Sequence, residues 1–347
     1  MIKTFFLGDI SLNDNYRKIN YNPFDKITNE FISKDFIIGN LESISKGKQG
    51  ENILKKPRLT SDIKTLNFLT DLKLDVACLA QNHIFDHLED GFNQTVESLE
   101  KQKIKYLGAG NLKNLKTDII IKKNDVSIGL LNYVTLDTNP GIPKDSNIKV
   151  NIFNLEIVKA KINEIKKKVD HVVIILHWGG KVEGGQYPDL NQPKIAKELI
   201  DSGGDLIIGH HSHTIQPFEI YKGKHIYYSL GNFCFDDIKF EDKLYPLSPE
   251  RKKGLILNIK FKKNEYEIKH LFIKNENLCI SKDELGIKNY KSLVRNYNFF
   301  FKRRIFWSIY FFNLKKLKPF KNFMIRNDLT FSNKVKRIKK SIIKKIT

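Results

Sequence analysis

Residues 205–213 have the sequence DLIIGHHSH, an apolar run of strand length that ends in a cluster of imidazoles. His211 and His213 stand at positions i and i+2 on a segment that leaves this predicted strand. Two imidazoles at this spacing are costly to crowd unless a cation is present. The pair therefore predicts metal ligands rather than hydrogen-bonded histidines of a core.

Four other apolar runs in the first 240 residues also end in polar clusters. They are residues 4–7 before Gly8-Asp9, 35–38 before Gly39-Asn40, 75–80 before Gln81-Asn82-His83, and 171–176 before His177. Short runs that are apolar on both alternating faces predict strands buried between two layers.

Helical patterns separate these predicted strands, at residues 61–72, 91–101, 153–169 and 193–202, with Ser61 as the expected N-cap of the first. Alternating strands and helices predict an α/β fold with a largely parallel or mixed sheet. In such folds ligands bind beyond the carboxyl ends of the strands, and each polar cluster follows such an end. We therefore expect the clusters to form one site.

The pattern changes after Gln216. Residues 218–221 and 225–230 flank Lys222-Gly223-Lys224, and residues 254–262 and 266–273 flank Lys263-Asn264-Glu265. These segments predict two hairpins, which we expect to complete a second sheet. From about residue 285 the pattern is helical, basic and aromatic. We predict one domain over residues 1–280 and a helical extension over residues 281–347.

The polar clusters have ordinary explanations when each is taken alone. Gly8-Asp9 would form a turn, Asn40 and Glu42 would cap a helix or line a loop, and His177 would be a hydrogen-bonded core residue. Together, however, carboxylate, amide and imidazole groups without a nearby thiolate are ligands suited to Mn, Zn or Fe. Two adjacent ions would activate water and bind both oxygens of a phosphoryl transfer.

The ordered set of motifs resembles the signature of the CapA family of capsule-synthesis proteins. The motifs are Gly8-Asp9, Gly39-Asn40-Leu41-Glu42, Gln81-Asn82-His83 with Asp86, His177-Trp178-Gly179, Gly209-His210-His211-Ser212-His213 with Gln216-Pro217, and Tyr228-Ser229-Leu230-Gly231-Asn232-Phe233. The resemblance covers residues 4–236. It implies a calcineurin-like metallophosphoesterase sandwich, which consists of two mixed β-sheets flanked by helices.

The resemblance also implies roles for individual residues. His83 would protonate the leaving oxygen, and Asp86 would orient it. Glu42 would bridge two metal ions. The implied metal ligands are Asp9, Glu42, Asn82, His177, His211 and His213, and the implied helpers, in the second shell or at the substrate, are Asn40, His210 and Asn232.

Two departures from the wider superfamily and one from many CapA relatives are visible. Asp9 is followed by Ile10 and Ser11 rather than by the Asp-x-His pattern, and Asn40-Leu41-Glu42 replaces a Gly-Asp motif. CapA relatives share both changes. Many relatives carry a Glu soon after the glycine of the His177 motif, whereas this chain has Gly180-Lys181 and then Glu183. This last difference predicts a changed substrate or a weakened site.

These observations predict a metal-dependent, phosphoesterase-like hydrolase that acts in capsule or surface-polymer synthesis, with an anionic polymer or phosphodiester as substrate. The alternative is a non-catalytic, polymer-binding or scaffolding member that its basic tail recruits to the membrane. If the alternative holds, substituting His83 and His211 would leave the phenotype unchanged, whereas removing the tail would abolish it.

The basic charge lies mainly in the tail. The formal net charge is +21, and residues 288–347 contribute 18 Lys or Arg against the single acid Asp328. Residues 290–331 also hold 13 of the 39 aromatic residues. Such a segment is suited to the interface of an anionic membrane, or to packing on the catalytic domain. Single-stranded nucleic acid ranks third, because no nucleic-acid fold accompanies the segment.

The cysteines and the hydropathy pattern bear on the compartment. Cys78, Cys234 and Cys279 show no CxxC spacing, which favours a reducing compartment. The sequence MIKTFFLGDI lacks the pattern of a signal peptide, and no apolar run reaches the roughly 20 residues of a spanning helix. We expect a cytoplasmic protein that contacts the inner face of the membrane through its tail.

Overall fold

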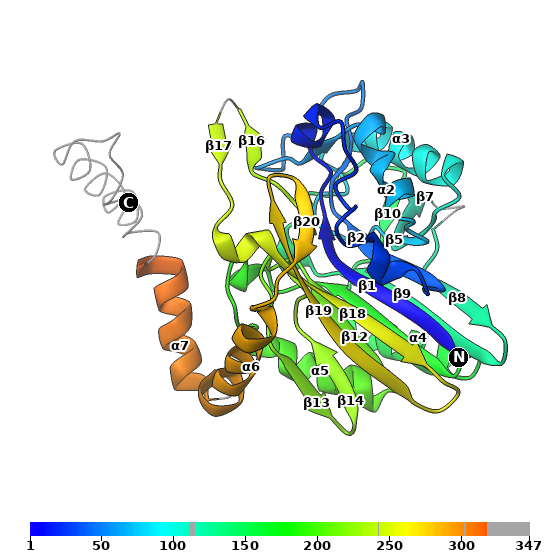
Figure 1. Ribbon diagram of the computed structural model, residues 1–347, viewed down its shortest axis with the longest axis vertical. Coiled ribbons are helices and arrows are strands. Elements are labelled where there is room, and N and C mark those ends of the chain that lie inside the picture. The colour runs from blue at the N-terminus through cyan, green and yellow to red at the C-terminus, as the bar shows by residue number, and fades with distance from the viewer. Residues whose placement is uncertain (112–114, 242, 302, 318–347) are drawn as a thin grey trace. The chain divides into compact units, whose positions relative to one another are not determined.

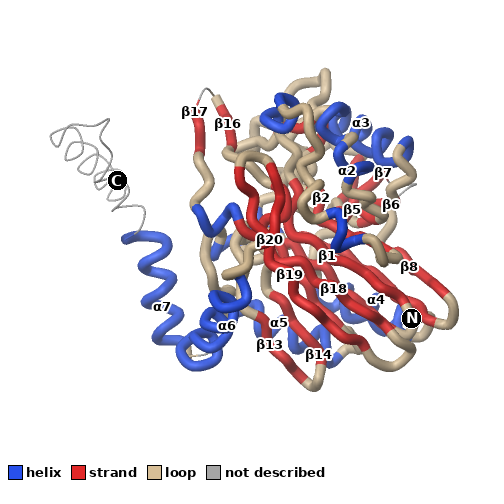
Figure 2. Tube along the Cα trace, viewed as in Figure 1, coloured by secondary structure: helices blue, strands red, loops and turns tan. Residues whose placement is uncertain are grey.

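The computed structural model describes residues 1–111, 115–241, 243–301 and 303–317 (Figure 1). The chain forms two compact units, Met1–Arg295 and Asn296–Thr347. The first unit contains two large β-sheets flanked by helices (Figure 2). Within the described residues of the second unit the structure is helical. The assignment of residues 281–347 as a separate extension stays a prediction.

The first large sheet contains eight strands and is mixed, because β1, β2, β5 and β6 are parallel whereas β18, β19 and β20 are antiparallel. A short strand, β15, pairs in parallel with the end of β1. In spatial order the strands are β20 (Cys279–Lys282), β19 (Tyr266–Glu276), β18 (Lys253–Phe261), β1 (Ile2–Ile10), β2 (Phe36–Leu41), β5 (Val76–Cys78) and β6 (Lys105–Leu107), with β15 (Asn232–Cys234) beside β1.

The second large sheet contains six strands, of which β14, β12, β11 and β9 are parallel. In spatial order they are β13 (Phe218–Tyr221), β14 (Lys224–Tyr227), β12 (Leu206–His210), β11 (His171–His177), β9 (Val126–Val134) and β8 (Asp118–Lys123). The remaining strands form three small pairs: β3 (Ile44–Ser45) with β4 (Thr60–Ser61), β7 (Ala109–Asn111) with β10 (Ile148–Val150), and β16 (Ile238–Phe240) with β17 (Lys243–Tyr245).

The helices are mostly short. The α-helices are α1 (Ile63–Leu66), α2 (Phe68–Asp71), α3 (Leu88–Lys101), α4 (Leu155–Lys166), α5 (Asn191–Asp201), α6 (Gly286–Asn296) and α7 (Arg304–Phe312). Single turns of 3-10 helix occur at Asp14–Lys18, Thr28–Phe31, Leu136–Thr138, Gly180–Val182 and Pro249–Lys252, and π-helical turns at Tyr297–Phe301 and Asn313–Leu317. None of the helices in the described part of the chain combines the length and apolar character needed to cross a bilayer.

The core lies in layers. One apolar cluster contains side chains from both large sheets, such as Phe6 and Ile175, and therefore fills the space between them. A second contains Phe5 of β1 and Phe92 of α3, so helices cover the outer face of the first sheet. A β-carbon on Gly129 of β9 would lie 2.4 Å from Ile165 of α4, so this helix packs closely on the second sheet. The predicted arrangement of two mixed sheets flanked by helices is confirmed.

The prediction of one helix over residues 61–72 is wrong in detail. The structure has two short helices there, α1 and α2, and the N-cap of α1 is Asp62 rather than Ser61. Oδ1 of Asp62 accepts a hydrogen bond from the backbone of Thr65 at 2.8 Å, and Thr65 Oγ1 accepts one from the backbone of Asp62 at 3.1 Å. Ser61 is not available as a cap because it is buried in β4 and pairs with β3.

The expected place of the second hairpin is also wrong. The hairpin β13–β14 joins the second sheet as predicted, but β18–β19 joins the first sheet. β18 lies antiparallel to β1, with Ile2 opposite Phe261 and Phe6 opposite Leu257. This pairing buries the apolar side chains of β18 between the two sheets beside those of β1.

Candidate metal centre

The polar residues predicted from the sequence all come together where strands of the two large sheets end. Asp9 lies near the end of β1, Asn40 near the end of β2, and Asn82 follows β5. From the second sheet, His177 ends β11 and His210 ends β12. Each of the predicted residues is less than a tenth exposed: Asp9, Asn40, Glu42, Asn82, His83, Asp86, His177, His210, His211, His213 and Asn232.

Two glycines allow the backbones around the site to approach closely. A β-carbon on Gly8 would lie 2.2 Å from the carbonyl oxygen of Gly231, and one on Gly209 would lie 1.9 Å from that of Tyr228. Real β-carbons do not approach an oxygen so closely, so a side chain at either position would push the strand away. The glycines before Asp9 and His210 therefore set the distance between the strand ends and residues 228–231.

The histidine loop after β12 has an unusual backbone. His211 has φ of +92° and His213 has φ of +57°, both in the region that L-residues rarely occupy. Such strain is commonly found at functional sites, where the surrounding structure maintains it. Here Nδ1 of His211 lies 3.1 Å from Nε2 of His177, and Nδ1 of His213 lies 3.0 Å from Oδ1 of Asn232.

Asp9 connects the two sheets. Its Oδ1 is 2.8 Å from Nδ1 of His210 and accepts a hydrogen bond from Nδ2 of Asn40 at 2.9 Å. Its Oδ2 accepts one from the backbone nitrogen of His211 at 3.3 Å. Burial by itself would raise the pKa of Asp9, but the hydrogen bonds and charges of His210 and His213 outweigh it and hold that pKa well below its usual value. Asp9 is therefore a buried carboxylate anion.

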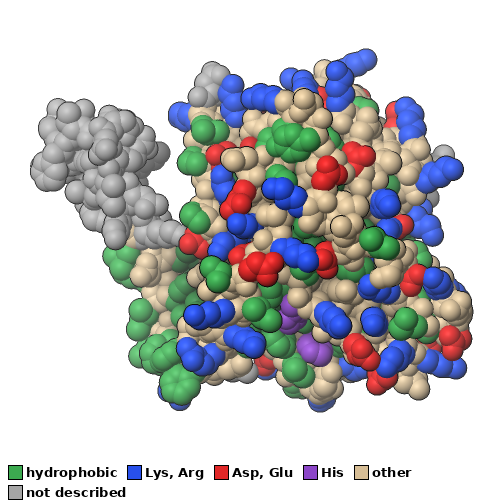
Figure 3. Space-filling model, in the orientation of Figure 1, with side chains coloured by type: hydrophobic (Ala, Val, Ile, Leu, Met, Phe, Trp, Pro, Cys, Tyr) green, Lys and Arg blue, Asp and Glu red, His purple; other side chains and the backbone are tan. Residues whose placement is uncertain are grey.

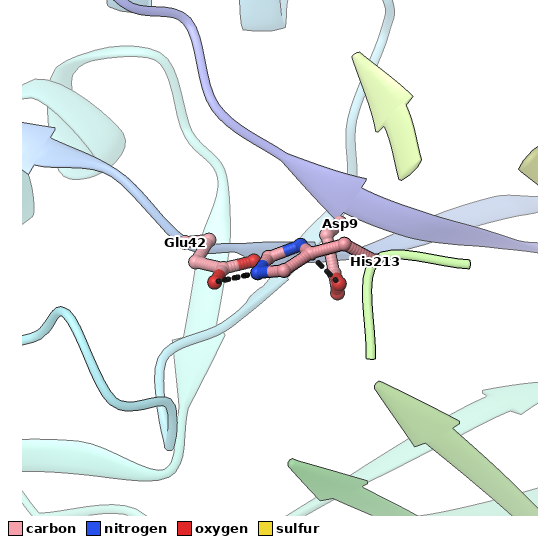
Figure 4. Close-up of side chains that lie close together, drawn as sticks. All are labelled: Asp9, Glu42 and His213. Atoms are coloured by element: carbon pink, nitrogen blue, oxygen red, sulfur yellow. Dashed lines mark ion pairs between the residues drawn. The ribbon is translucent and has the colours of Figure 1, made fainter. Parts of the chain in front are cut away.

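Asp9, Glu42 and His213 form the cluster best suited to hold a cation. Their nearest ligand atoms all lie within 4.8 Å of one another, and the His213 ring lies between the two carboxylates (Figure 4). Nδ1 of His213 is 3.4 Å from Oδ2 of Asp9, and its Nε2 is 3.4 Å from Oε1 of Glu42. A buried carboxylate pair with an imidazole suits a borderline divalent ion.

The bonding of Glu42 provides a direct test of this fit. Neither of its carboxylate oxygens accepts a hydrogen bond from a described residue, although the side chain is fully buried. Burial, with the nearby charge of Asp9, raises the pKa of Glu42 well above its usual value despite the opposing charge of His213. A buried carboxylate that accepts no hydrogen bond is costly even beside the His213 imidazole, and a metal ion would remove that cost. The residues present therefore fit a metal ion.

The histidines of the site differ in protonation. Burial, with some repulsion from neighbouring imidazoles, lowers the pKa of His177 well below its usual value and that of His211 to about 3. Both rings are thus neutral, as metal ligands must be, and Nε2 of His211 has no hydrogen-bond partner among the described residues. Burial alone would also lower the pKa of His213, but the negative charges of Glu42 and Asp9 outweigh burial and raise this pKa to about 9.

The remaining predicted residues surround this cluster. Oδ1 of Asn82 lies 2.8 Å from Nε2 of His177, so the amide and the imidazole face each other across the two sheets. Nδ1 of His83 lies 2.6 Å from Oδ2 of Asp86, and its Nε2 lies 4.0 Å from Oε1 of Glu42. His83 therefore places one ring nitrogen on a buried carboxylate and the other beside the cluster.

A pocket of about 220 Å³ opens beside His83, His211 and His213. Sequence reasoning gave no role to Lys55 or Arg251, which also line this pocket, because neither lies in a motif. Glu183 lines it too, and Arg251 binds its carboxylate at 3.1 Å. Against the effect of desolvation, the charges of His211, His213 and Arg251 lower the pKa of Glu183 to about 2.

Comparisons with known proteins found relatives over the part of the chain that contains these residues. Residues 3–237 match the family model described as "Bacterial capsule synthesis protein PGA_cap". The chain is 30% identical over 244 residues to the "PGA biosynthesis protein CapA" of Bacillus subtilis (strain 168), and the match covers 68% of this chain and 64% of that protein. It is 30% identical over 213 residues to the "Capsule biosynthesis protein CapA" of Bacillus anthracis, which covers 59% of this chain and 51% of that protein.

Among solved structures, the chain is similar in fold to one described as a novel phosphatase from Mycoplasma pneumoniae. The TM-score is 0.50 at 14% sequence identity, and the match covers 84% of this chain and 98% of that chain. The predicted metallophosphoesterase-type sandwich is thereby confirmed as the fold. The chain spans less than two thirds of the length of the two Bacillus relatives.

Proposed function

Because the chain belongs to the bacterial capsule synthesis protein family PGA_cap, as its motifs predicted, we propose that it is a metal-dependent hydrolase of the phosphoesterase type that acts in capsule or surface-polymer synthesis. The observation that carries the proposal is the buried cluster of Asp9, Glu42 and His213 beside a pocket that His83 lines. A purely structural core would not leave the carboxylate of Glu42 without a hydrogen-bond donor among the residues that the structure describes.

The proposed cofactor is a pair of divalent ions, Mn, Zn or Fe. The residues that would hold them are Asp9, Glu42, Asn82, His177, His211 and His213. When bound, the ions would supply Lewis-acid charge and activate water for attack on a phosphorus or carbonyl centre. Asn40 and His210 support this set, because both hydrogen-bond the carboxylate of Asp9 and so fix its orientation.

His83 is the proposed proton donor to the leaving group. Because Nδ1 faces Asp86, a proton on Nε2 is available on the side of the ring that faces the cluster. Asp86 would hold the ring in this orientation. Asn232 would act indirectly, because its Oδ1 contacts His213 and its Nδ2 donates to the backbone of Arg251.

The experiment that tests the proposal combines elemental analysis with a substrate screen. The purified protein should contain a divalent metal and should hydrolyse a phosphodiester or an amide of the γ-glutamyl type. His83→Ala should retain the metal and lose the hydrolysis, whereas His211→Ala should lose both. Protein that binds no divalent metal at neutral pH would refute the proposal.

A non-catalytic scaffolding function is the second candidate, and the described part of the tail favours it. Phe299, Ile305, Ile309, Phe312 and Leu317 are each at least half exposed. Figure 3 shows hydrophobic side chains gathered on the surface of the segment that contains α7. Arg303, Arg304, Lys315 and Lys316 lie in the same segment, so it is suited to the interface of an anionic membrane. Residues 318–347 of the predicted tail lie outside the described residues.

Nucleic acid is a less suitable partner for the first unit. On the face shown in Figure 3, Lys and Arg are interspersed with Asp and Glu rather than gathered in one patch. The scaffolding function is tested by deletion of residues 297–347, which leaves α6 and its buried Tyr290 in place. Loss of capsule in this deletion, with normal capsule in His83→Ala, would favour scaffolding over catalysis.

A further inference from the structure

Lys55 is a buried cation in the wall of the pocket. Lys55 lies in the segment between β3 and β4 and is 4% exposed. It lines the pocket together with His83 and His211. Burial lowers the pKa of Lys55, and the charges of Asp86, Glu42 and Glu183 oppose this effect. Lysine is almost never fully buried unless it has a partner. The position therefore calls for an explanation.

The ammonium group of Lys55 has N–H donors that its hydrogen bonds do not use. Its Nζ donates to the backbone oxygen of Asn139 at 2.6 Å, and this is its one hydrogen-bond partner in the described part of the chain. The carboxylates of Asp86, Glu42 and Glu183 act on it through their charge and make no hydrogen bond with it among the described residues. A lysine ammonium carries three N–H donors, so two remain without an acceptor in the described part of the chain. By contrast, Arg251 on the same pocket is already paired with Glu183.

The side chain is also held in place along its length. A β-carbon on Gly141 would lie 2.5 Å from Cγ of Lys55, so the aliphatic stem packs against the backbone there. Nη1 of Arg58 donates to the backbone oxygen of Lys55 at 2.9 Å. A long side chain fixed in this way loses little further conformational freedom when it binds a ligand.

Asp86 ties the Lys55 segment to His83. The backbone nitrogen of Asn52 donates to the backbone oxygen of Asp86 at 2.9 Å. The backbone nitrogen of Leu59 donates to the side-chain Oδ2 of Asp86 at 2.6 Å. The same Oδ2 contacts Nδ1 of His83. Both ends of the segment are therefore fixed to the residue that orients the proposed proton donor.

We propose that Lys55 binds an anionic group of the substrate, a carboxylate or a phosphate, beside the bond that is cleaved. This inference rests on the proposed function and narrows it to substrates that carry an additional negative charge near the reacting centre. A purely structural role, in which Lys55 only links two loops through Asn139, is the competing explanation.

The test compares anion binding by Lys55→Met and Lys55→Arg with that of the wild type. The full-length, manganese-loaded proteins are titrated at fixed ionic strength with two probes, a γ-linked glutamate tetramer and inorganic phosphate, in a calorimeter. Metal content and Tm are measured in parallel. Lys144→Met is the matched control, because Lys144 is exposed and does not line the pocket.

We expect Lys55→Met to bind at least one probe roughly tenfold to a hundredfold more weakly than the wild type, as the loss of a charge-assisted hydrogen bond requires. Metal content should be unchanged, and Lys55→Arg should recover part of the affinity. The probe that is affected identifies the anion as carboxylate or phosphate. Lys144→Met should bind both probes as the wild type does.

Unchanged anion affinity in Lys55→Met, with a lowered Tm, would show that Lys55 is a structural link and would overturn the inference. So would a wild type that binds neither probe. Failure of the hydrolase proposal looks different. In that case the wild type would hydrolyse no substrate, yet anion binding would still depend on Lys55.

Discussion

Oδ2 of Asp86 lies 2.6 Å from Nδ1 of His83. The same oxygen accepts a hydrogen bond from the backbone nitrogen of Leu59, at the end of the segment that carries Lys55. One buried carboxylate oxygen therefore fixes both the orientation of an imidazole and the position of a pocket wall. Its other oxygen, Oδ1, has no hydrogen-bond partner among the described residues.

Asp86→Asn should reduce kcat without loss of metal. The amide can still contact His83, but it holds the ring less firmly than the carboxylate, whose oxygens act only as acceptors. General acid catalysis contributes roughly 10²–10⁴-fold to a rate, and we expect a loss of at least about tenfold. The loss should be larger for an alkyl ester than for a nitrophenyl ester, whose leaving group needs no proton. Equal losses on both esters would contradict the role of His83 as an acid.

Glu42→Gln should separate metal binding from folding. Without metal, the variant should be at least as stable as the wild type, because it removes a buried carboxylate that accepts no hydrogen bond from the described residues. With metal at a hundred times its Kd, the wild type should gain about 2.7 kcal/mol of unfolding free energy, and the variant much less. Thermal unfolding with and without Mn²⁺ measures both effects. Glu219→Gln, at a buried glutamate that pairs with Lys197, is the control that should keep the metal-dependent gain.

Gly209→Ala should destabilise the protein, because its β-carbon would overlap the backbone oxygen of Tyr228. Overpacking of this kind costs roughly 1–3 kcal/mol, and more where backbone must move. Urea unfolding measures the cost. Gly223→Asn is the control, since Gly223 has open space around it and asparagine tolerates its positive φ. Equal stability of the two variants would mean that the close approach at Gly209 is not required.

His270 should make stability depend on pH outside the metal centre. Burial, with repulsion from His225, lowers the pKa of His270 to about 4, whereas its value in the unfolded chain is about 6.5. Between these values the unfolded state binds the additional proton, so stability rises with pH and falls as the pH drops from 6.5 toward 4.

His270→Phe should flatten this dependence by on the order of 1–2 kcal/mol between pH 4.5 and pH 7. The measurement is the free energy of unfolding in urea at both pH values. The variant also removes the contact of Tyr227 Oη with Nε2 of His270 at 2.7 Å, so its stability should be lower at pH 7. The decisive quantity is therefore the difference between the two pH values, and an unchanged difference would contradict the assignment.

The sequence by itself determined the order of the elements of this protein and the polar residues that follow its buried strands. The apolar runs before Asp9, Asn40, Asn82, His177 and His210 do belong to strands, because burial between two layers selects apolar residues on both faces of a strand. Parallel strands direct their carboxyl ends to one edge, so the polar residues that follow had to meet there. The order of the motifs therefore sufficed to predict the family and the fold.

Only the tertiary structure decided which groups interact and in which state. The pairing of β18 with β1, the positions of Lys55 and Arg251 on the pocket, and the contact of Asp86 with Leu59 all join residues far apart in the chain. His211 and His213, two residues apart, have pKa values of about 3 and about 9. Local sequence cannot encode that difference, because burial and the distance to Glu42 and Asp9 set the free energy of protonation of each imidazole.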